Sequence, residues 1–350
     1  MPTRVLLVGA GAIGAFFGSR LATTPHVLVS ALCRSNYKFV RDNGFKVTSP
    51  KYGDYVFKPE FTFASPDEVK RVKRERQLRW DFLLVATKAL PDVSDDSALL
   101  DGLIDDSTSI VLIQNGVGIE APYRKRFPDQ PVLSAVTNAS CVQSQAGVIE
   151  HNKWTRISIG PFLPHLDSGD GQAKSSDEVA NQKTQHLIDL LKSGGIPDAE
   201  LYDHAGIQFV RWHKIAINAA MNPSAVLSGG AGNQEMAQDP GLAIHAEGIM
   251  NEVLAAVPKI LGKEVPWKKL KLATPKQVLE SVSRNTTGSR PSMYWDWVEG
   301  RRMELEAILG NPIRMAREKG IDMPRVQTMY ALLRKAQERR DVAKDKSSKL

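Results

Sequence analysis

The stretch RVLLVGAGAIGAFFGSRLA, residues 4–22, decides the fold of the first half of the chain. It opens with an apolar run, turns through glycines spaced as GxGxxG, and continues with helical spacing through Phe17 and Leu21. Glycines cluster in many turns, but a strand before this pattern and a helix after it are the setting in which it binds a dinucleotide. The stretch therefore predicts the first strand, turn and helix of a Rossmann-like α/β domain.

Each glycine of the pattern has a separate physical task. Gly9 permits the tight turn, Gly11 lets backbone N–H groups approach a pyrophosphate at the helix N-terminus, and Gly14 allows the helix to pack closely on the strand. We predict that these glycines, with Ala12 and Ile13 between them, form the cofactor-binding turn.

A second apolar run, HVLVSALCRS at residues 26–35, stands where the second strand is expected, and its end indicates which dinucleotide binds. A NAD-binding chain carries Asp or Glu there for the ribose hydroxyls. This chain instead has Arg34, followed by Ser35 and Lys38. A guanidinium pairs well with a 2′-phosphate, so the sequence favours NADP(H). The alternative is a solvated arginine at a strand end.

Two later strand ends also carry polar side chains. DFLLVATKAL (81–90) leads to Lys88, and SIVLIQNGVG (109–118) leads to Asn115. In open α/β sheets the ligand lies beyond the carboxyl ends of the strands, so both side chains are expected to join Arg34 around it. Taken singly, each is also compatible with ordinary turn chemistry.

The remaining pattern predicts how the chain is divided. Before residue 205 we expect two closing strands at 147–152 and 156–161, followed by an exposed loop at 164–175. A helix that ends at Lys192 and a connecting passage at 193–203 complete this part of the chain. After it we expect helices that include 242–261, 296–320 and 325–339. These elements give a NADP-binding Rossmann-like domain over 1–204, an all-α domain over 205–340 and a flexible tail over 341–350.

The segment HKIAINAAMNP (213–223) places an ammonium and two carboxamides in an otherwise apolar helix. Lys214, Asn218 and Asn222 recur every four residues, and at about 100° per residue they form one polar stripe. A stripe of this kind suits the wall of a ligand pocket, and it equally suits a buried polar network between helices.

The composition argues against several classes of protein. Two segments account for the net charge of +7: residues 70–79 carry +5 and residues 334–350 carry +4, while the rest of the chain sums to −2. Neither segment is interleaved with aromatic residues, so we interpret both as solvated surface and predict no nucleic-acid partner. No apolar run approaches the roughly 18 residues of a membrane span. Two cysteines, Cys33 and Cys141, and scattered histidines match no disulfide framework or metal motif, so we predict no metal.

Several motifs together resemble those of the ketopantoate reductase (2-dehydropantoate 2-reductase) family, and the chain looks like a fungal-type member. They are GxGxxG near the N-terminus, TKA at 87–89, QNGVG at 114–118, KIAINAAMNP at 214–223 and PSMYWDWVEGRRMELEAILG at 291–310. The resemblance implies a Rossmann-like domain followed by a helical domain similar to the C-terminal domain of 6-phosphogluconate dehydrogenase. It also implies NADPH-dependent reduction of 2-dehydropantoate to (R)-pantoate, in pantothenate and coenzyme A biosynthesis.

The resemblance further implies roles for individual residues. Lys214 matches the lysine that gives a proton to the carbonyl oxygen, and Glu304 matches the glutamate that orients lysine and substrate. Asn218 and Asn222 match residues lining the substrate pocket, and Ser292 matches a serine at the carboxylate end of the substrate. The positions that match the surroundings of the cofactor are Arg34, Lys88 and Asn115. We also place Asn115 among the substrate contacts and Glu304 beside the cofactor.

The chemistry agrees with these roles, because reducing a ketone creates negative charge on oxygen that a proton-donating cation stabilises. For Glu304 the alternative is a surface ion pair with Arg301 or Arg302 on its own helix.

Two departures from the family pattern concern the substrate. Ser289 stands where relatives often carry asparagine, and SMYWD replaces the usual SMLQD, which brings Tyr294 and Trp295 near the site unless they serve in helix packing. A bulkier 2-oxo acid is therefore an alternative substrate. A non-catalytic NADP-binding regulator is an alternative of another class. Such a regulator has no evident need for all five of the polar residues Lys214, Asn218, Asn222, Ser292 and Glu304. A homodimer is compatible with each of these.

The chain finishes with Ser348, Lys349 and Leu350, the tripeptide of a peroxisomal import signal. On this basis we expect binding to the import receptor and a location in the peroxisomal matrix, with a cytoplasmic pool also compatible. The alternative is an uninformative tail.

Overall fold

The computed structural model describes residues 2–163 and 174–347, which form two compact units. The first unit extends to Ile207 and the second begins at Gln208, close to the boundary expected at 204. Two short earlier segments, Ala89–Ser94 and Asn115–Gly118, group with the second unit. Most of the loop expected at 164–175 and the terminal tripeptide 348–350 lie outside the described residues.

The first unit is built on a sheet of ten strands among the described residues. The strands are β1 (Thr3–Val8), β2 (Val27–Leu32), β3 (Phe45–Thr48), β4 (Tyr55–Phe57), β5 (Thr62–Phe63), β6 (Phe82–Val85), β7 (Ser109–Leu112), β8 (Val132–Gln145), β9 (Val148–Pro161) and β10 (Ala199–Leu201). They pair in the order β4-β3-β9-β8-β7-β6-β1-β2-β5, with β10 added on β9. From β5 to β8 all pairs are parallel, and β9 returns antiparallel to β8.

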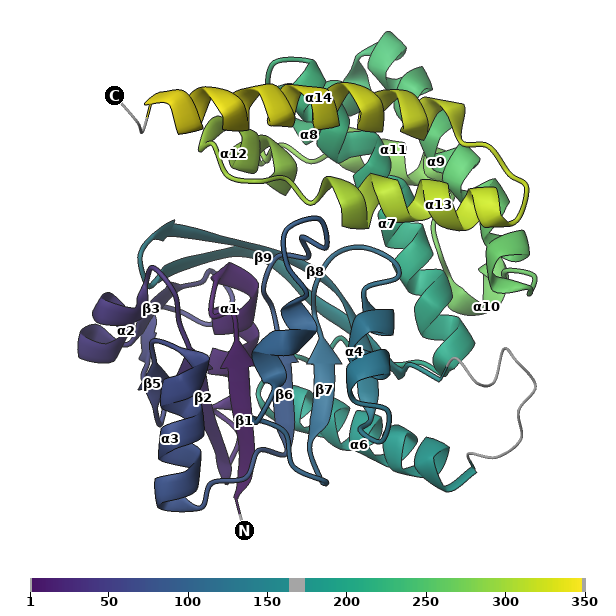
Figure 1. The fold of residues 1–350 in the computed structure, drawn as a ribbon. Helices are drawn as coiled ribbons and strands as arrows, with labels where there is room; N and C mark the ends of the chain where they lie inside the picture. Colours follow the sequence, from purple (N-terminus) through teal and green to yellow (C-terminus); the bar gives the residue numbers. More distant parts are fainter. Residues whose placement is uncertain (1, 164–173, 348–350) are drawn as a thin grey trace. The chain divides into compact units, whose positions relative to one another are not determined.

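Helices cover this sheet, and Figure 1 shows α3 in front of it and α6 behind it. The helices are α1 (Ala12–Leu21), α2 (Tyr37–Asn43), α3 (Pro66–Arg76), the 3-10 turn η1 (Asp96–Leu100), α4 (Glu120–Arg126) and α6 (Lys174–Ser193). Alternate residues of β1, Val5 and Leu7, join Phe16 of α1 and Leu187 of α6 in one apolar cluster. Because successive side chains of a strand point to opposite faces, α1 and α6 cover the same face of the sheet.

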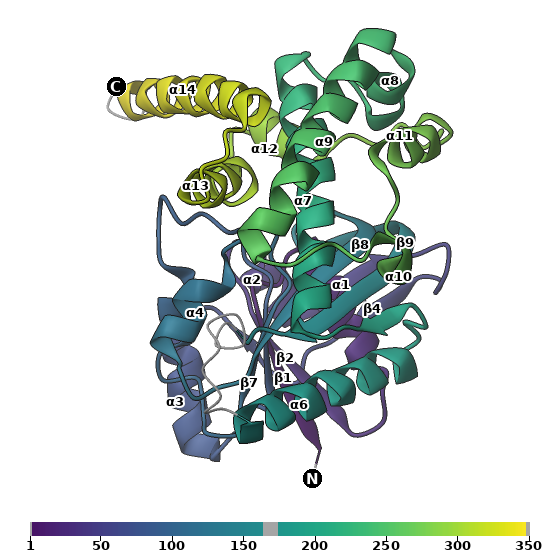
Figure 2. The same ribbon diagram turned by 90° about the vertical axis from the view of Figure 1, so that its right-hand side faces the viewer.

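The second unit is helical. Its elements are α7 (His204–Leu227), which starts in the first unit, then α8 (Asn233–Gln238), α9 (Pro240–Leu261), α10 (Trp267–Leu270), α11 (Pro275–Ser283), α12 (Ser292–Val298), the π-helical turn η3 (Glu306–Gly310), α13 (Asn311–Glu318) and α14 (Pro324–Ser347). The helices α8, α11, α13 and α14 all contact α9. Figure 2 shows α8 and α11 on one side of α9, and α13 and α14 on the other.

Local sequence explains why α9 begins and ends where it does. Asp239 caps its start by accepting a hydrogen bond from the N–H of Leu242 at 2.8 Å, and Pro240 occupies the first turn. Gly262 ends the helix in the left-handed conformation, with φ of +65°. This helix confirms the one expected over 242–261, and the predicted combination of a Rossmann-like domain with a helical domain is confirmed as well.

The single helix expected over 296–320 is wrong. The helix α12 ends at Val298, residues 299–304 are not helical, and helical structure resumes with η3 and α13. Gly300 adopts φ of +67°, a conformation that terminates helices. The glycine was visible in the sequence, but the apolar periodicity on both sides of it concealed the break.

Three other expectations need correction. The strands expected at 147–152 and 156–161 are parts of one continuous strand, β9. The passage at 193–203 contributes β10, which pairs with β9. The helix expected over 325–339 continues to Ser347, so the tail expected over 341–350 is helical as far as that residue.

Among residues 2–163 and 174–347, no helix combines the length and apolar character needed to cross a bilayer. The same residues contain no group of three His, Cys, Asp or Glu side chains that could hold a metal ion. Cys33 and Cys141 are free thiols, and burial raises the pKa of each to about 12, so neither is an activated nucleophile.

Candidate functional site

The glycine turn of the first unit is closed on one side and open on the other. Gly9 has φ of +91°, and a Cβ there would lie 2.6 Å from the backbone nitrogen of Thr87. A Cβ at Gly14 would lie 2.5 Å from the carbonyl oxygen of Gly9. At Gly11, the N-cap of α1, a Cβ would meet no heavy atom within 4 Å. The turn thus needs glycine at Gly9 and Gly14 for packing, whereas at Gly11 the space is free for a ligand.

The first N–H groups of α1, among them those of Ala12 and Ile13, have no partner within the helix. Together with the helix dipole they favour an anion at this end. The open side of the turn at Gly11 therefore fits a dinucleotide pyrophosphate.

Asn36 braces the same turn, and the sequence analysis missed it. Its Nδ2 donates to the carbonyl oxygen of Ala10 at 2.8 Å and to Oε1 of Gln143 at 3.0 Å. The side chain is 6% exposed, so these bonds are shielded from water. An asparagine two residues after Arg34, close to the end of β2, was the available signal.

The structure places the two predicted cofactor cations of the first unit shortly after strand ends. Arg34 follows β2, and Lys88 follows β6. Both side chains are exposed, as groups that bind a phosphate from solution have to be. Both thus follow strand ends, where residues of open sheets meet a ligand, and their contact with a cofactor stays a prediction.

A polar network also missed from the sequence ties the ends of β6 and β7 together. Gln114 Nε2 donates to Thr87 Oγ1 at 2.9 Å and to Asp96 Oδ2 at 3.2 Å, and Thr87 Oγ1 donates to the same carboxylate oxygen at 2.8 Å. Thr87 and Gln114 belong to the TKA and QNGVG motifs, so the motifs held the signal. The network fixes the strand ends from which Lys88 and Asn115 continue.

In the second unit the predicted polar stripe lies on α7. Lys214 and Asn218 are partly buried and Asn222 is 5% exposed, while Ile215 and Ala219 on the neighbouring faces are buried. The expected apolar helix with its polar stripe is confirmed. The stripe is neither fully solvated nor fully buried, which is the environment of a group that meets a ligand.

Lys214 lies in an environment that weakens its hold on a proton. Burial and, to a smaller extent, the positive charge of Arg211 lower the pKa of Lys214, while the negative charge of Glu304 raises it, and the net result is a pKa of about 8. Arg211 is 2% exposed and is held in place by the carbonyl oxygen of Gly116, to which its Nη1 donates at 3.0 Å. A group with a pKa near the working pH is suited to proton transfer.

Glu304 is buried, with 7% of its surface exposed, and both carboxylate oxygens accept hydrogen bonds. Oε1 accepts from the backbone N–H of Ala89 at 3.0 Å, and Oε2 accepts from Asn115 Nδ2 at 3.3 Å. The structure thus brings three predicted site residues, Lys214, Glu304 and Asn115, into one interacting group.

The alternative interpretation of Glu304, a surface ion pair with Arg301 or Arg302, is wrong. Arg301 pairs with Asp296 at 3.0 Å, and Arg302 pairs with Asp92 at 2.9 Å. Because the chain is not helical over 299–304, neither arginine lies one helical turn from Glu304.

The helix break at Gly300 is what gives Glu304 this position. After the break the chain stays non-helical as far as Glu304, and the π-helical turn η3 follows. π-turns of this kind are frequent at functional sites. The N–H of Val117 donates to the carbonyl oxygen of Ala307 at 3.1 Å, so η3 also holds the segment that contains Asn115.

Ser292 is the first residue of α12, and its side chain is exposed. The described contacts do not join it to the group around Lys214. Tyr294 packs on Gly230, where a Cβ would lie 2.7 Å from its hydroxyl oxygen, which supports the helix-packing alternative for this aromatic. Trp295 is 41% exposed, and its ring makes an edge contact with that of Tyr294.

Comparison with known proteins agrees with both units. The family description "Ketopantoate reductase PanE/ApbA" matches residues 5–164, and "Ketopantoate reductase PanE/ApbA C terminal" matches residues 207–337. A 2-dehydropantoate 2-reductase from Nostoc is 26% identical over 328 residues, which cover 94% of this chain and 93% of that protein. The Meiotically up-regulated gene 72 protein of Schizosaccharomyces pombe is 26% identical over 94% of this chain, which spans only 56% of that longer protein.

Among solved structures, the 2-dehydropantoate 2-reductase from Methylococcus capsulatus has a TM-score of 0.77 and 28% identity, covering 96% of this chain and 97% of its own. The agreement extends over both the glycine turn and the helical unit that carries Lys214 and Glu304. The chain therefore belongs to the ketopantoate reductase family, whose members are NADP-dependent oxidoreductases.

Proposed function

We propose that the chain reduces a 2-oxo acid with NADPH, and that 2-dehydropantoate, giving (R)-pantoate, is its substrate. One observation carries the proposal: Lys214, an amine with a lowered pKa, interacts with the buried carboxylate of Glu304 on the helical unit of a ketopantoate reductase family member.

The chemistry of the reduction assigns a task to each residue. Bound NADPH supplies the hydride that reduces the carbonyl carbon. The ammonium of Lys214 donates a proton to the carbonyl oxygen, on which negative charge develops. Glu304 orients that ammonium and keeps it charged, because its carboxylate raises the pKa of Lys214. Asn115, Asn218, Asn222 and Ser292 contact the substrate through amide and hydroxyl groups, which add no further titrating group.

The preference for NADPH rests on Arg34. Its exposed guanidinium follows β2, where a chain specific for NAD carries a carboxylate. The glycine turn at Gly9, Gly11 and Gly14 holds the pyrophosphate, and Lys88 adds positive charge beyond β6.

A bulkier 2-oxo acid is the second candidate substrate. Trp295 is exposed close to Ser292, at the start of α12, and an indole there favours an aromatic or branched side chain on the substrate. The alternative in which the chain only binds NADP as a regulator predicts cofactor binding without turnover.

The test is NADPH oxidation by the full chain with a panel of straight, branched and aromatic 2-oxo acids that includes 2-dehydropantoate. We expect turnover with at least one acid, and for Lys214→Ala we expect kcat to fall by about 10²-fold or more. Lys259→Ala, which removes an exposed lysine from α9, is the control and should leave kcat unchanged. NADPH binding without oxidation of any acid, or full activity of Lys214→Ala, would overturn the proposal.

A further inference from the structure

The non-helical segment before Glu304 is held by side chains of α14. The backbone N–H of Met303 donates to Oε1 of Gln337 at 2.8 Å, and Gln337 is 5% exposed. Arg340 donates to the carbonyl oxygens of Arg301 at 2.6 Å and Trp297 at 3.0 Å. The broken helix thus obtains hydrogen-bond partners from α14 in place of those it loses.

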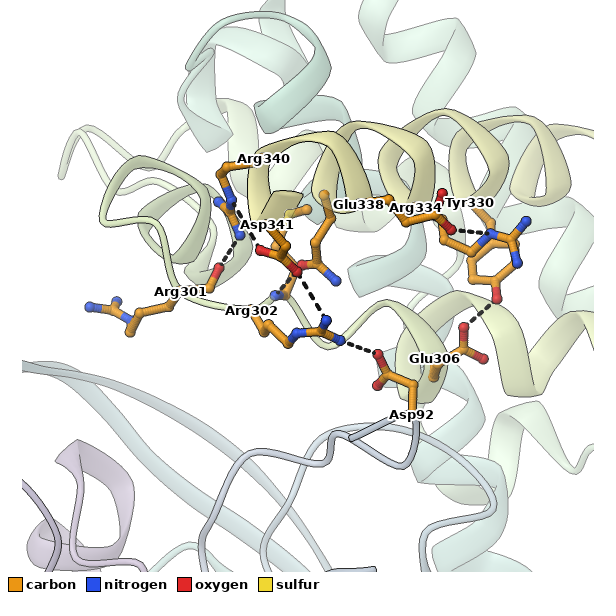
Figure 3. A network of polar contacts seen from close by, with 11 residues as sticks. Asp92, Arg301, Arg302, Glu306, Tyr330, Arg334, Glu338, Arg340 and Asp341 are labelled. Carbon is orange, nitrogen blue, oxygen red and sulfur yellow. Dashed lines mark hydrogen bonds and ion pairs between the residues drawn. The ribbon is translucent and has the colours of Figure 1, made fainter. Parts of the chain in front are cut away.

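Arg302 connects α14 to the segment Ala89–Ser94. Its Nη2 lies 3.0 Å from Asp341 of α14, and its Nη1 lies 2.9 Å from Asp92 (Figure 3). The two carboxylates are therefore joined through one guanidinium, whose planar fork suits two acceptors at once.

These contacts close a ring on Glu304. Asp92 lies three residues after Ala89, whose N–H donates to Glu304 Oε1, and Arg302 lies two residues before Glu304 in the chain. The segment that contains Ala89 and the segment that contains Glu304 are thus joined by two contacts, the Glu304–Ala89 hydrogen bond and the Asp92–Arg302 ion pair. Arg302 is 42% exposed and its partners are 32% and 27% exposed, so the pairs add little to global stability.

We propose that Arg302, with Asp92 and Asp341, is a positioning residue that fixes Glu304 and Ala89 against each other for proton delivery. The inference rests on the proposed reductase function, and it gives Asp341 of α14 a role in the reaction that acts through Arg302. Gln337 and Arg340 support it by holding the backbone of residues 297–303.

The test compares Arg302→Gln and Asp341→Asn with variants of a second ion pair, which lies within α14. Arg334 and Glu338 of α14 form an ion pair at 3.7 Å with side chains 60% and 48% exposed, and among the described residues no hydrogen bond or ion pair joins them to residues 301–303 (Figure 3). For Arg302→Gln and Asp341→Asn we expect kcat to fall roughly 3- to 30-fold, as for an interaction that positions a catalytic group, with KM for NADPH unchanged. Arg302→Lys, which keeps a cation beside one carboxylate, should restore part of kcat. Arg334→Gln and Glu338→Gln should leave kcat unchanged.

Hydrogen exchange of the Ala89 amide provides a readout that does not depend on activity. Exchange should accelerate in Arg302→Gln and stay at the wild-type rate in Arg334→Gln, because only the former loosens the Glu304–Ala89 bond. Wild-type inactivity toward every 2-oxo acid would reject the proposed function, whereas the exchange result would still decide the positioning role. Unchanged exchange, or a loss of kcat equal to that of the control pair, would overturn the inference.

Discussion

Glu304 and Ala89 are joined by a hydrogen bond of 3.0 Å between a buried carboxylate oxygen and a backbone N–H, across 215 positions of sequence. The second carboxylate oxygen accepts from Asn115, so a single side chain gathers the segments that follow β6 and β7. The negative charge of Glu304 raises the pKa of Lys214 and so favours its ammonium form.

The pH dependence of reduction should report the proton on Lys214. The reaction needs the ammonium, whose pKa is lowered to about 8 by burial and the charge of Arg211 against the opposing effect of Glu304, so kcat/KM should fall as the pH rises through about 8. Glu304→Gln removes the charge that raises this pKa, and it should move the alkaline limb to lower pH. Arg211→Gln removes a charge that lowers it, and it should move the limb to higher pH. Shifts in the same direction for both variants would contradict the assignment, and pH–rate profiles of the three proteins provide the measurement.

Arg34→Ala should discriminate between the two nicotinamide cofactors. Loss of a charge-assisted contact to a phosphate costs about 1.5–3 kcal/mol, so Kd for NADPH should rise roughly 10- to 100-fold. Kd for NADH should change little, since NADH lacks the 2′-phosphate. Lys125→Ala, which removes an exposed cation from α4, is the control. An equal loss for both cofactors, measured by fluorescence titration, would argue against phosphate recognition by Arg34.

Asn36→Ala should weaken NADPH and NADH alike. The change removes the donor to Ala10, so the glycine turn loses a buried brace and the unfolding free energy should drop by about 1–2 kcal/mol. Asn43→Ala, which removes an exposed asparagine bonded to Phe39, should affect neither property by comparison. Cofactor titrations and thermal unfolding check this, and an Asn36→Ala protein that selectively lost NADPH would contradict it.

Gly14→Ala should mainly reduce stability, whereas Gly11→Ala should mainly weaken NADPH binding. A methyl group at Gly14 would meet the carbonyl oxygen of Gly9 at 2.5 Å, so that variant should lose stability by several kcal/mol or fail to fold. A methyl group at Gly11 meets nothing, so that variant should keep its melting temperature while it binds NADPH more weakly. A melting temperature that fell equally in both would show that the space at Gly11 serves packing rather than a ligand.

Local sequence was enough to predict the glycine turn, the strand ends and the stripe on α7. These features depend on spacing within a few residues, such as the four-residue repeat of Lys214, Asn218 and Asn222. The fold class followed from the same patterns because a strand–turn–helix unit leaves few arrangements open.

The environment of Glu304 could not be predicted in this way. Its partners, Ala89 and Asn115, are remote in sequence, and the helix break at Gly300 was hidden by continuous apolar periodicity. Asn36 was missed for a related reason, because its partner Ala10 lies in a turn that a linear motif describes only by its glycines. Contacts between distant segments decide such cases, and one sequence without relatives does not display them.

The grouping of Ala89–Ser94 and Asn115–Gly118 with the second unit has a consequence for dissecting the protein. A polypeptide begun at Gln208 would lack the two donors that satisfy the Glu304 carboxylate, and it would leave Arg302 without Asp92. The helical part is therefore not a portable module that could be expressed by itself or grafted onto another nucleotide-binding domain. A chimeric protein with this helical unit would also have to contain the segments Ala89–Ser94 and Asn115–Gly118.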